Sequence, residues 1–436
     1  AAISSPAGTG AIAVIRLSGD NAIAIASAVF VPRNVSRTLS KAPAQSAVFG
    51  HIVDPSTGTA IDEVIATTFH APHSFTTEDM VELSCHGSLY IQNKILKLLI
   101  DNGARMATPG EFTKRAFVNG RIDLAQAEAV ADLIGARSAA AHKLAIKQLK
   151  GSVSERLSRL REKLVHLASL LELELDFSDH EDVEFADRTE LLDIATETQK
   201  EIARLCSSFA QGNAIKNGIP VAIIGEPNVG KSTLLNRLVG DDAAIVSDIA
   251  GTTRDSIERE VILNGTLFRL IDTAGIHETD DTIERLGIER SMRAIENAMI
   301  VLELTTPSGP CVSKEKHILV VNKIDTAPEG YKVPDGAIAI SAKHGDNINL
   351  LTEALTSFIG EPLEDVTITN ARHYEVLSHA QEFINMVING LEMNIPSDLV
   401  AQDLRECTSL LAEVTGGEIT PDEVLGNIFS KFCIGK

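Results

Sequence analysis

Eight consecutive residues near the middle of the chain have the types and spacing needed to bind phosphate. They read Gly-Glu-Pro-Asn-Val-Gly-Lys-Ser from Gly225 to Ser232, after an apolar run and before a helical one. The glycines let backbone N–H groups curl around phosphate oxygens, Lys231 neutralises the β and γ oxygens, and Ser232 can ligate Mg²⁺ at a helix N-terminus. We predict a phosphate-binding loop formed by Asn228, Val229, Gly230, Lys231, Ser232 and Thr233.

Two further segments contain groups that would respond to the terminal phosphate. Asp272-Thr273-Ala274-Gly275 follows a second apolar run, so its acid can steady the magnesium shell and its glycine N–H can sense the γ-phosphate. The segment 249–255 lies between the two motifs, and its Thr253 is suited to closing on Mg²⁺, together with Ser232, only when that phosphate is present. This order predicts two switch elements.

A third motif predicts which base is bound. Asn322-Lys323-Ile324-Asp325 follows another apolar run, and the Asp325 carboxylate can accept hydrogen bonds from guanine N1–H and its 2-amino group, which adenine does not offer. Ser341-Ala342-Lys343 fits a loop that contacts the guanine oxygen through backbone N–H groups. The motifs together predict GTP as the nucleotide.

How GTP would be hydrolysed is less evident from the motifs. Ile276 follows the second switch motif and cannot orient a water molecule as a glutamine there would. No arginine finger is identifiable, so another cation must offset charge in the transition state. Asn228 offers a side-chain oxygen for a monovalent cation near the phosphates; the alternative is that it only shapes the loop.

Composition limits the remaining function classes. The 436 residues carry a net charge of −21, which repels nucleic acid, so any RNA contact must be local. The five cysteines are scattered without a C-x-x-C pair, which argues against a zinc site or a disulfide scaffold. Apolar runs are too short to span a bilayer, and no secretory pattern opens the chain. We expect a cytoplasmic protein.

The pattern of apolar, β-branched and helix-forming residues along the sequence predicts which elements position these motifs. Residues 1 to about 115 mix β-branched runs with turn clusters, which indicates an α+β domain; residues 124 to about 210 are helical. Residues 221–360 alternate apolar strands with helical segments, as in a doubly wound α/β domain, and helical texture then returns. The α/β domain therefore appears as an insertion into a helical one.

Two local patterns leave questions open. Leu157, Leu160, Leu164, Leu167 and Leu171 recur at spacings of three and four, which predicts a helix whose apolar stripe faces either the core or a second copy. The connection from Thr305 to His317 is short and polar where a crossover helix is expected, which leaves open whether residues are missing there.

The whole chain resembles the MnmE (TrmE) family of tRNA-modifying GTPases. Besides the nucleotide motifs, Phe112-Thr113-x-Arg115-Ala116-Phe117, Leu124-Ala125-Gln126-Ala127-Glu128-Ala129 and the ending Gly426-x-Ile428-Phe429-x-x-Phe432-Cys433-Ile434-Gly435-Lys436 are similar to segments of that family. The resemblance implies a folate-binding, dimerising N-terminal domain at 1–116, a helical domain at 117–212 and 365–436, and an inserted Ras-like G domain at 213–364.

The resemblance also implies a potassium-activated G domain. The residues matching the family's K⁺ ligands are Asn228, Ser247, Ile249 and Thr252, in agreement with the role considered for Asn228. A glutamate beyond the second switch would orient the attacking water, and Glu284 matches it. On its residues alone, Glu284 is one acid in a charged run. Lys231 and Thr252 complete the catalytic set, and Cys433 is included as a thiol that is either reactive or structural.

For the N-terminal domain, the resemblance implies a bound tetrahydrofolate derivative, 5-formyl or 5,10-methylene, as the one-carbon donor. The matching contacts are Arg16, Glu82, Arg121 and Lys436. A carboxylate suits the donor pair of a pterin, and arginines suit carboxylates or ring oxygens. Arg121 stands where some relatives have lysine, which changes the donor geometry. His86 is either a turn residue or a proton carrier.

The activity implied is modification of tRNA wobble uridine 34 at C5, of the aminomethyl or carboxymethylaminomethyl type. It would require a homodimer and an FAD-binding partner, MnmG (GidA), in a heterotetramer or larger complex. Two alternatives remain. One is a binding switch like the ribosome-assembly GTPases, which would require a basic RNA-binding module. The other is a one-carbon transferase that GTP merely regulates.

Overall fold

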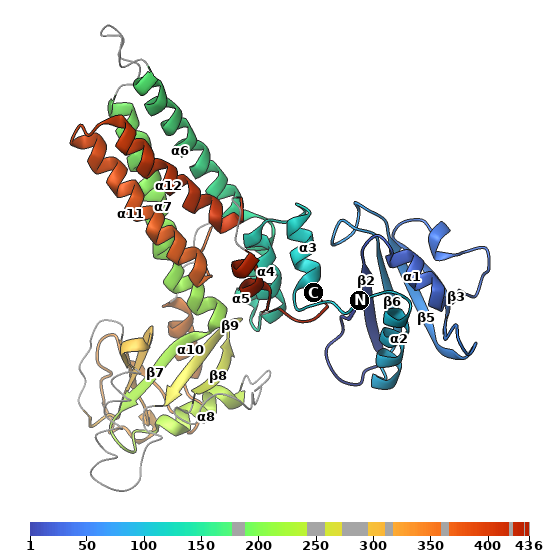
Figure 1. The fold of residues 1–436 in the computed structure, drawn as a ribbon. Helices are drawn as coiled ribbons and strands as arrows, with labels where there is room; N and C mark the ends of the chain where they lie inside the picture. The colour runs from blue at the N-terminus through green and yellow to red at the C-terminus, as the bar shows by residue number, and fades with distance from the viewer. Residues whose placement is uncertain are drawn as a thin grey trace, which may run out of the picture. The chain divides into compact units, whose positions relative to one another are not determined.

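The computed structural model describes residues 1–176, 188–241, 258–272, 295–309, 317–358, 366–417, 422–430 and 432–435 (Figure 1). The chain forms two compact units. The first comprises Ala1–Ala131, Leu149–Ser154 and Leu411–Lys436, and the second comprises Asp132–Gln148 and Glu155–Leu410. No helix in the described part of the chain is long and apolar enough to cross a membrane.

The first unit is built on a six-stranded antiparallel sheet with the order β1-β2-β6-β5-β4-β3. Buried and exposed residues alternate along β2, as expected for strands with one face on the core. The strands are β1 Ala2–Ile3, β2 Ile12–Ser18, β3 Phe30–Pro32, β4 Ser46–Val53, β5 Ala60–Phe69 and β6 Met80–His86, and the helices packed on them are α1 Ala22–Val29 and α2 Leu89–Asp101, with a short 3-10 turn at Leu39–Lys41. This confirms the α+β prediction for the N-terminal part.

The C-terminal motif belongs to the same unit. Helices α3 (Glu111–Val118), α4 (Leu124–Gly135) and α13 (Asp422–Ser430) follow the sheet. Phe429 and Phe432 pack with Leu124 in a small apolar core. The last described residues then pair with the turn before α3, since Pro109 forms a β-bridge with Ile434. Three segments carry the family resemblance outside the G domain, and the C-terminal one contacts both of the others, through Leu124 and through α3.

The second unit contains the doubly wound sheet, with the order β12-β11-β10-β7-β9-β8. All neighbouring strands are parallel except β8, which runs antiparallel to β9. Its elements are β7 Ile219–Gly225, α8 Lys231–Asp241, β8 Glu258–Leu263, β9 Thr266–Asp272, β10 Ile300–Thr305, β11 His317–Val321, a 3-10 turn at Ile324–Thr326, β12 Ile338–Ala339 and α10 Ile348–Ser357. Strand β7 lies between β10 and β9, so the loop after it opens where the strand order reverses, which is the usual ligand position in such sheets.

Long helices make up the rest of the second unit (Figure 1). Ion pairs join α6 to α7 (Lys163 to Glu197) and to α12 (Arg405 to Glu172). The helices are α5 Ala139–Leu149, α6 Ser152–Asp176, α7 Arg188–Asn217, α11 Ala371–Glu392 and α12 Ser397–Thr415. All five leucines of the α6 stripe are buried within the chain, which favours the core-facing interpretation over a self-association surface.

The α/β domain is inserted into these helices as predicted. One residue, Gly218, separates the end of helix α7 from the start of β7. The chain returns at 366–370 beside the same helix. There the Ile368 N–H donates to Ser208 Oγ at 3.0 Å, and a Cβ on Gly212 would lie 2.3 Å from the Ile368 carbonyl oxygen. Exit and return points are thus adjacent. Strands β10 and β11 are parallel neighbours, and residues 310–316 of the short connection lie outside the described residues.

Candidate functional site

The phosphate loop joins the end of β7 to the start of α8. Gly225 and Gly230 have φ values of +149° and +100°. A Cβ on Gly225 would lie 2.4 Å from the Leu304 carbonyl oxygen, and one on Gly230 would lie 2.4 Å from Asn322 Nδ2. Both positions need glycine because a side chain would clash with the neighbouring strand ends. The loop therefore has the tight backbone path predicted from its sequence.

The loop lysine lies across the loop itself. Lys231 Nζ donates to the carbonyl oxygens of Gly225 at 2.6 Å and Glu226 at 3.0 Å. The residue is only 7% exposed. Burial lowers the pKa of Lys231, while the negative charge of Asp272 at the end of β9 acts to raise it. The ammonium is thus held at the mouth of the loop, near the acid of the predicted second switch motif.

The base-reading motif is bonded directly to the phosphate loop. Asn322, 2% exposed, donates from Nδ2 to the Val229 carbonyl oxygen at 2.8 Å and accepts from the Ala342 N–H at 2.9 Å. Lys323 Nζ donates to the Asn228 carbonyl oxygen at 2.6 Å. These three hydrogen bonds fix the spacing between the phosphate loop, the end of β11 and the segment 341–343.

The carboxylate predicted to select guanine is oriented by its neighbours. Ser341 Oγ donates to Asp325 Oδ1 at 2.7 Å, and His344 Nε2 lies 3.7 Å from Asp325 Oδ2. The Ser341 hydrogen bond, followed by weaker effects including the charge of Lys343, lowers the pKa of Asp325. The group is therefore held as a carboxylate, the form that accepts the two guanine donors. Sequence reasoning missed His344, and nothing in the motif distinguishes it.

Some of the predicted site residues lie in described segments and others do not. Of the two predicted magnesium ligands, Ser232 is described and Thr253 is not. Ser232 and Thr233 are exposed at the start of α8, and Lys343 follows Ala342 in the base-reading loop. Ser247, Ile249, Thr252, Thr253, Thr273, Ala274, Gly275 and Glu284 lie outside the described residues.

The folate candidates lie together in the first unit. Arg16 Nε is 2.7 Å from Glu82 Oε1 across the β2–β6 pair, and Arg16 Nη1 donates to the Gly435 carbonyl oxygen at 3.3 Å. Lys436, the next residue, lies outside the described residues. Gly435 has φ +92°, and a Cβ there would lie 2.6 Å from the Ile3 carbonyl oxygen, so the tail docks closely against β1.

A pocket of about 570 Å³ opens beside this pair. Glu82 and Arg121 line it, and Arg16 reaches it only through Glu82. Arg121 Nη1 donates to the Ser74 carbonyl oxygen at 2.6 Å, and its guanidinium lies 5.1 Å from the centre of the Phe75 ring. The remaining lining residues are Gln45, Phe69, Pro72, His73, Thr77, Met80, Asn119 and Gly120. The pocket therefore combines aromatic and apolar walls with one carboxylate and one guanidinium.

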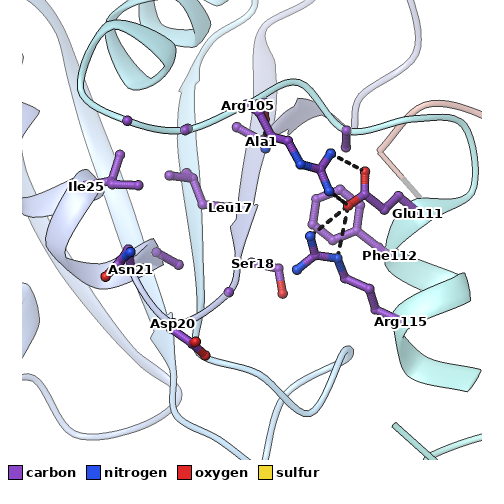
Figure 2. Close-up of a pocket in the computed structure, with 15 residues that line it drawn as sticks. Ala1, Leu17, Ser18, Asp20, Asn21, Ile25, Arg105, Glu111, Phe112 and Arg115 are labelled. Atoms are coloured by element: carbon purple, nitrogen blue, oxygen red, sulfur yellow. Dashed lines mark hydrogen bonds and ion pairs between the residues drawn. The ribbon is translucent and has the colours of Figure 1, made fainter. Parts of the chain in front are cut away.

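A second, smaller pocket of about 250 Å³ lies at the other side of α3's first turn, between the start of α1 and the segment 103–107 (Figure 2). Glu111 bonds both Arg105 and Arg115. Burial acts to raise the pKa of Glu111, but the hydrogen bonds from Arg105, Thr108 and Arg115 outweigh it and lower the pKa to about 2. Arg115 also pairs with Glu78 at 2.7 Å, so both guanidinium groups bond carboxylates within the chain, which assigns them to the packing of α3.

Two residues with open alternatives are now placed. Cys433 is exposed and its carbonyl oxygen accepts from the Gly110 N–H at 3.3 Å, so its backbone helps to dock the tail. His86 Nδ1 lies 2.7 Å from Asp62 Oδ1, and the side chain is 67% exposed. The Asp62 carboxylate also accepts from the His86 N–H. Sequence reasoning missed Asp62, which holds the end of β6 to β5.

The fold and the nucleotide site together define a P-loop protein of the guanine-nucleotide-binding class. The phosphate loop follows β7, and Asp325, the carboxylate predicted to bind guanine, follows β11, two strands away in the same sheet.

Comparison with known proteins narrows this class. Residues 1–121 match the family model "GTP-binding protein TrmE N-terminus", and residues 124–433 match "MnmE helical domain". A "tRNA modification GTPase MnmE" of Parabacteroides distasonis is 51% identical over 458 residues, covering 100% of this chain and 99% of that protein. One of Bacteroides fragilis is 49% identical, covering 98% and 97%. The chain belongs to the MnmE family, and it is a GTP hydrolase.

Solved structures add little to this assignment. Aquifex aeolicus Era bound to GDP and AlF4⁻ is 26% identical and covers 38% of this chain and 66% of that one, but its TM-score is 0.25. A score this low supports no structural conclusion.

Proposed function

We propose that this chain couples GTP hydrolysis to the modification of tRNA at C5 of wobble uridine 34. The name shared by its relatives indicates tRNA as the substrate. The observation that carries the proposal is the presence, in one chain, of a guanine-specific nucleotide site and a separate pocket suited to a folate. Mass spectrometry of tRNA from a strain lacking this chain should show unmodified uridine 34, restored by the wild-type chain and not by Asp325→Asn.

The pocket of about 570 Å³ lined by Glu82 and Arg121 supports a tetrahydrofolate derivative, 5-formyl or 5,10-methylene, as the one-carbon donor. A pterin presents adjacent N–H donors, which suit Oε2 of Glu82 while Oε1 is held by Arg16. The ring would lie against Phe69 or Phe75, and Arg121 is placed for a ring oxygen or a carboxylate. Lys436, one residue beyond the docked Gly435, completes the proposed contacts. The residues present therefore fit the group chemically.

Calorimetry with 5-formyltetrahydrofolate tests this site. Arg121→Ala and Glu82→Gln should each weaken binding by roughly 10-fold or more, because each removes a charge-assisted hydrogen bond of about 1.5–3 kcal/mol. Arg33→Ala is a matched control, since Arg33 also stacks on an aromatic ring, Phe49, at 5.8 Å but lines neither pocket. No heat from the wild-type chain would remove Arg16, Glu82 and Arg121 from the site.

The nucleotide site is proposed to need two metal ions. Mg²⁺ would be held by Ser232 and Thr253, and K⁺ by Asn228, Ser247, Ile249 and Thr252. Of the K⁺ residues the described part contains Asn228, which is exposed and has a φ of +64°. GTP turnover should be faster in potassium than in sodium at equal ionic strength. Equal rates, or an Asn228→Ala variant that keeps the potassium response, would contradict this assignment.

Catalysis is proposed to use Glu284 to orient the attacking water, with Lys231 and Thr252 stabilising the phosphates and Cys433 as a candidate thiol of the modification step. Glu284→Ala should lower kcat while leaving GTP affinity nearly unchanged. A large loss of affinity would instead point to a defect in the switch.

The proposed assembly is a cytoplasmic homodimer, joined through domain 1–116, that works with the FAD-binding MnmG in a heterotetramer or larger complex. The proposed domain bounds are 1–116, 117–212 with 365–436, and 213–364. Light scattering of the chain alone and mixed with MnmG tests the assembly. A chain that stays monomeric and does not bind MnmG would refute it.

A further inference from the structure

Several stretches of this acidic chain contain no acidic residue, among them 21–53, 133–154 and 202–225. The stretch from Leu133 to Ser154 contains Arg137, Lys143, Lys147 and Lys150, and helix α5, Ala139–Leu149, occupies its centre. Arg137 is paired with Glu260 of β8, so the lysines are the source of the local positive charge.

The lysines of α5 lie on its outward face. Ala141, Ala145 and Gln148 are buried, and at 100° per residue they mark the side of the helix that faces the core. Lys143 and Lys147 are four residues apart, so they share one face about 6 Å apart along the axis, and that face is opposite to the buried one. Lys143 is exposed and Lys147 is half-buried on this outer face.

Several other cations of the second unit are paired with carboxylates. Lys163 pairs with Glu197 at 2.7 Å, Lys216 pairs with Asp132 at 2.6 Å, and Arg156 pairs with Glu201. In the portion of the chain that the structure describes, no carboxylate pairs with Lys143 or Lys147. Two lysines on one face without acidic partners repel one another slightly, which favours an anionic ligand from outside.

We propose that the face of α5 formed by Lys143 and Lys147 binds the phosphate backbone of tRNA. This inference rests on the proposed function for the identity of the RNA. A chain of net charge −21 needs a local cationic surface to hold RNA, because phosphate contacts supply most of the sequence-independent affinity. Lysines contact phosphates as flexible point charges, which suits positioning rather than base reading.

The position of α5 gives this contact a further consequence. Arg137, just before the helix, forms an ion pair with Glu260 of β8, and the Ala140 N–H donates to the Gly265 carbonyl oxygen at 3.0 Å in the β8–β9 turn. Strand β9 ends at Asp272, beside Lys231 in the nucleotide site. The RNA-binding face therefore belongs to the helix that contacts the hairpin between the two predicted switches.

Binding of a labelled tRNA to the full-length chain tests the proposal as a function of salt. A phosphate contact contributes a factor of about 2.6 to 3.5 in affinity between 50 and 200 mM salt, because each has a slope of about −0.7 to −0.9. Two contacts then contribute roughly 10-fold. The variant Lys143→Ala/Lys147→Ala should bind tRNA more weakly than the wild type. Its drop in affinity between 50 and 200 mM salt should be smaller than the drop of the wild type by a factor of roughly 10.

Matched variants separate this role from charge and stability. Lys94→Ala/Lys97→Ala removes two lysines from α2 that are paired with Asp54 and Asp101, and it should leave tRNA affinity unchanged. Lys143→Arg/Lys147→Arg should retain the wild-type slope. Basal GTP turnover and circular dichroism should match the wild type in all variants, since these lysines lie outside the nucleotide site.

The outcomes distinguish the proposal from the function on which it rests. If the wild type binds tRNA and Lys143→Ala/Lys147→Ala binds it with the same affinity and slope, the α5 assignment is wrong and the proposed function stands. If the wild type binds no tRNA, both fail. If the variant binds tRNA normally but loses self-association or MnmG, the face belongs to a protein partner and the proposal is overturned.

Discussion

Replacing Asn322 by alanine should weaken the nucleotide site and the fold together. The side chain is 2% exposed, and its two partners, the Val229 carbonyl oxygen and the Ala342 N–H, belong to buried residues. Each buried group left without a partner costs about 1–3 kcal/mol. Because water can reach a loop more easily than a core, we expect the free energy of unfolding to fall by about 1.5 kcal/mol for each of the two groups, or about 3 kcal/mol in total.

The consequence for nucleotide binding follows from the same contacts. Without Asn322, the phosphate loop and the segment 341–343 lose their common anchor, so GTP must order both on binding. An ordering cost of about 3 kcal/mol corresponds to an affinity lower by roughly 100-fold. Asn236→Ala is the control, because this α8 residue is exposed and has a single contact, to Arg259.

The assay is urea unfolding of the full chain followed by far-ultraviolet circular dichroism, since the chain has no tryptophan, together with titration of a fluorescent GTP analogue. Lower stability with lower affinity is the expected pair of results. If affinity falls but the unfolding transition of the nucleotide domain does not move, Asn322 acts as a direct ligand contact and the anchoring argument is wrong.

Three further predictions concern other parts of the molecule. The pKa of Glu111 is lowered from 4.5 to about 2, so its contribution to the free energy of unfolding is fully present above pH 4.5 and is lost as pH falls toward 2. The shift corresponds to about 3.4 kcal/mol, which is reduced to on the order of 2 kcal/mol because Arg105 is 65% exposed. Glu111→Gln should flatten stability against pH in that window by circular dichroism, and an unchanged slope would contradict the assignment. Gly212→Ala should destabilise the helical bundle by about 1–3 kcal/mol, because the added Cβ would clash with the Ile368 carbonyl. The control Gly240→Ala should be neutral or stabilising, because its Cβ meets no atom within 4 Å. Equal shifts of the thermal unfolding midpoint in the two variants would refute the packing of Gly212 against Ile368. Burial raises the pKa of Cys85 to about 11 and of Cys407 to about 12, so peptide mapping after brief alkylation at pH 8 should find exposed Cys433 modified and these two protected; modified Cys407 in folded protein would contradict its burial.

The nucleotide site was largely predictable because its chemistry is local in sequence. The phosphate loop needs glycines at fixed positions, and the structure gives the physical reason, since a Cβ at Gly225 or Gly230 would meet Leu304 or Asn322. The alternation of strands and helices also predicted the doubly wound sheet and its insertion. These features have signatures within short segments, although the residues that require them, such as Leu304 and Asn322, come from distant parts of the chain.

Long-range contacts were less accessible from the sequence. The docking of Gly435 on β1 and Arg16 joins the two ends of the chain, and only the family resemblance indicated it. The partners Asp62 of His86 and His344 of Asp325 have no sequence signal, because isolated polar residues occur throughout the surface. The leucine stripe of α6 was ambiguous because periodicity shows which face is apolar and not what covers it.

The hydrogen bonds of Asn322 and Lys323 also make the two halves of GTP recognition interdependent. Asn322 and Lys323 both leave the end of β11, and they bond the Val229 and Asn228 carbonyl oxygens of the phosphate loop. Asp325, two residues further on, accepts a hydrogen bond from Ser341. If Asp325 binds the base as proposed, a base that fails to bond it would also lose support for the phosphate loop, because the same segment holds both. Discrimination against adenine nucleotides would then follow from this sharing as well as from the two hydrogen bonds to the base.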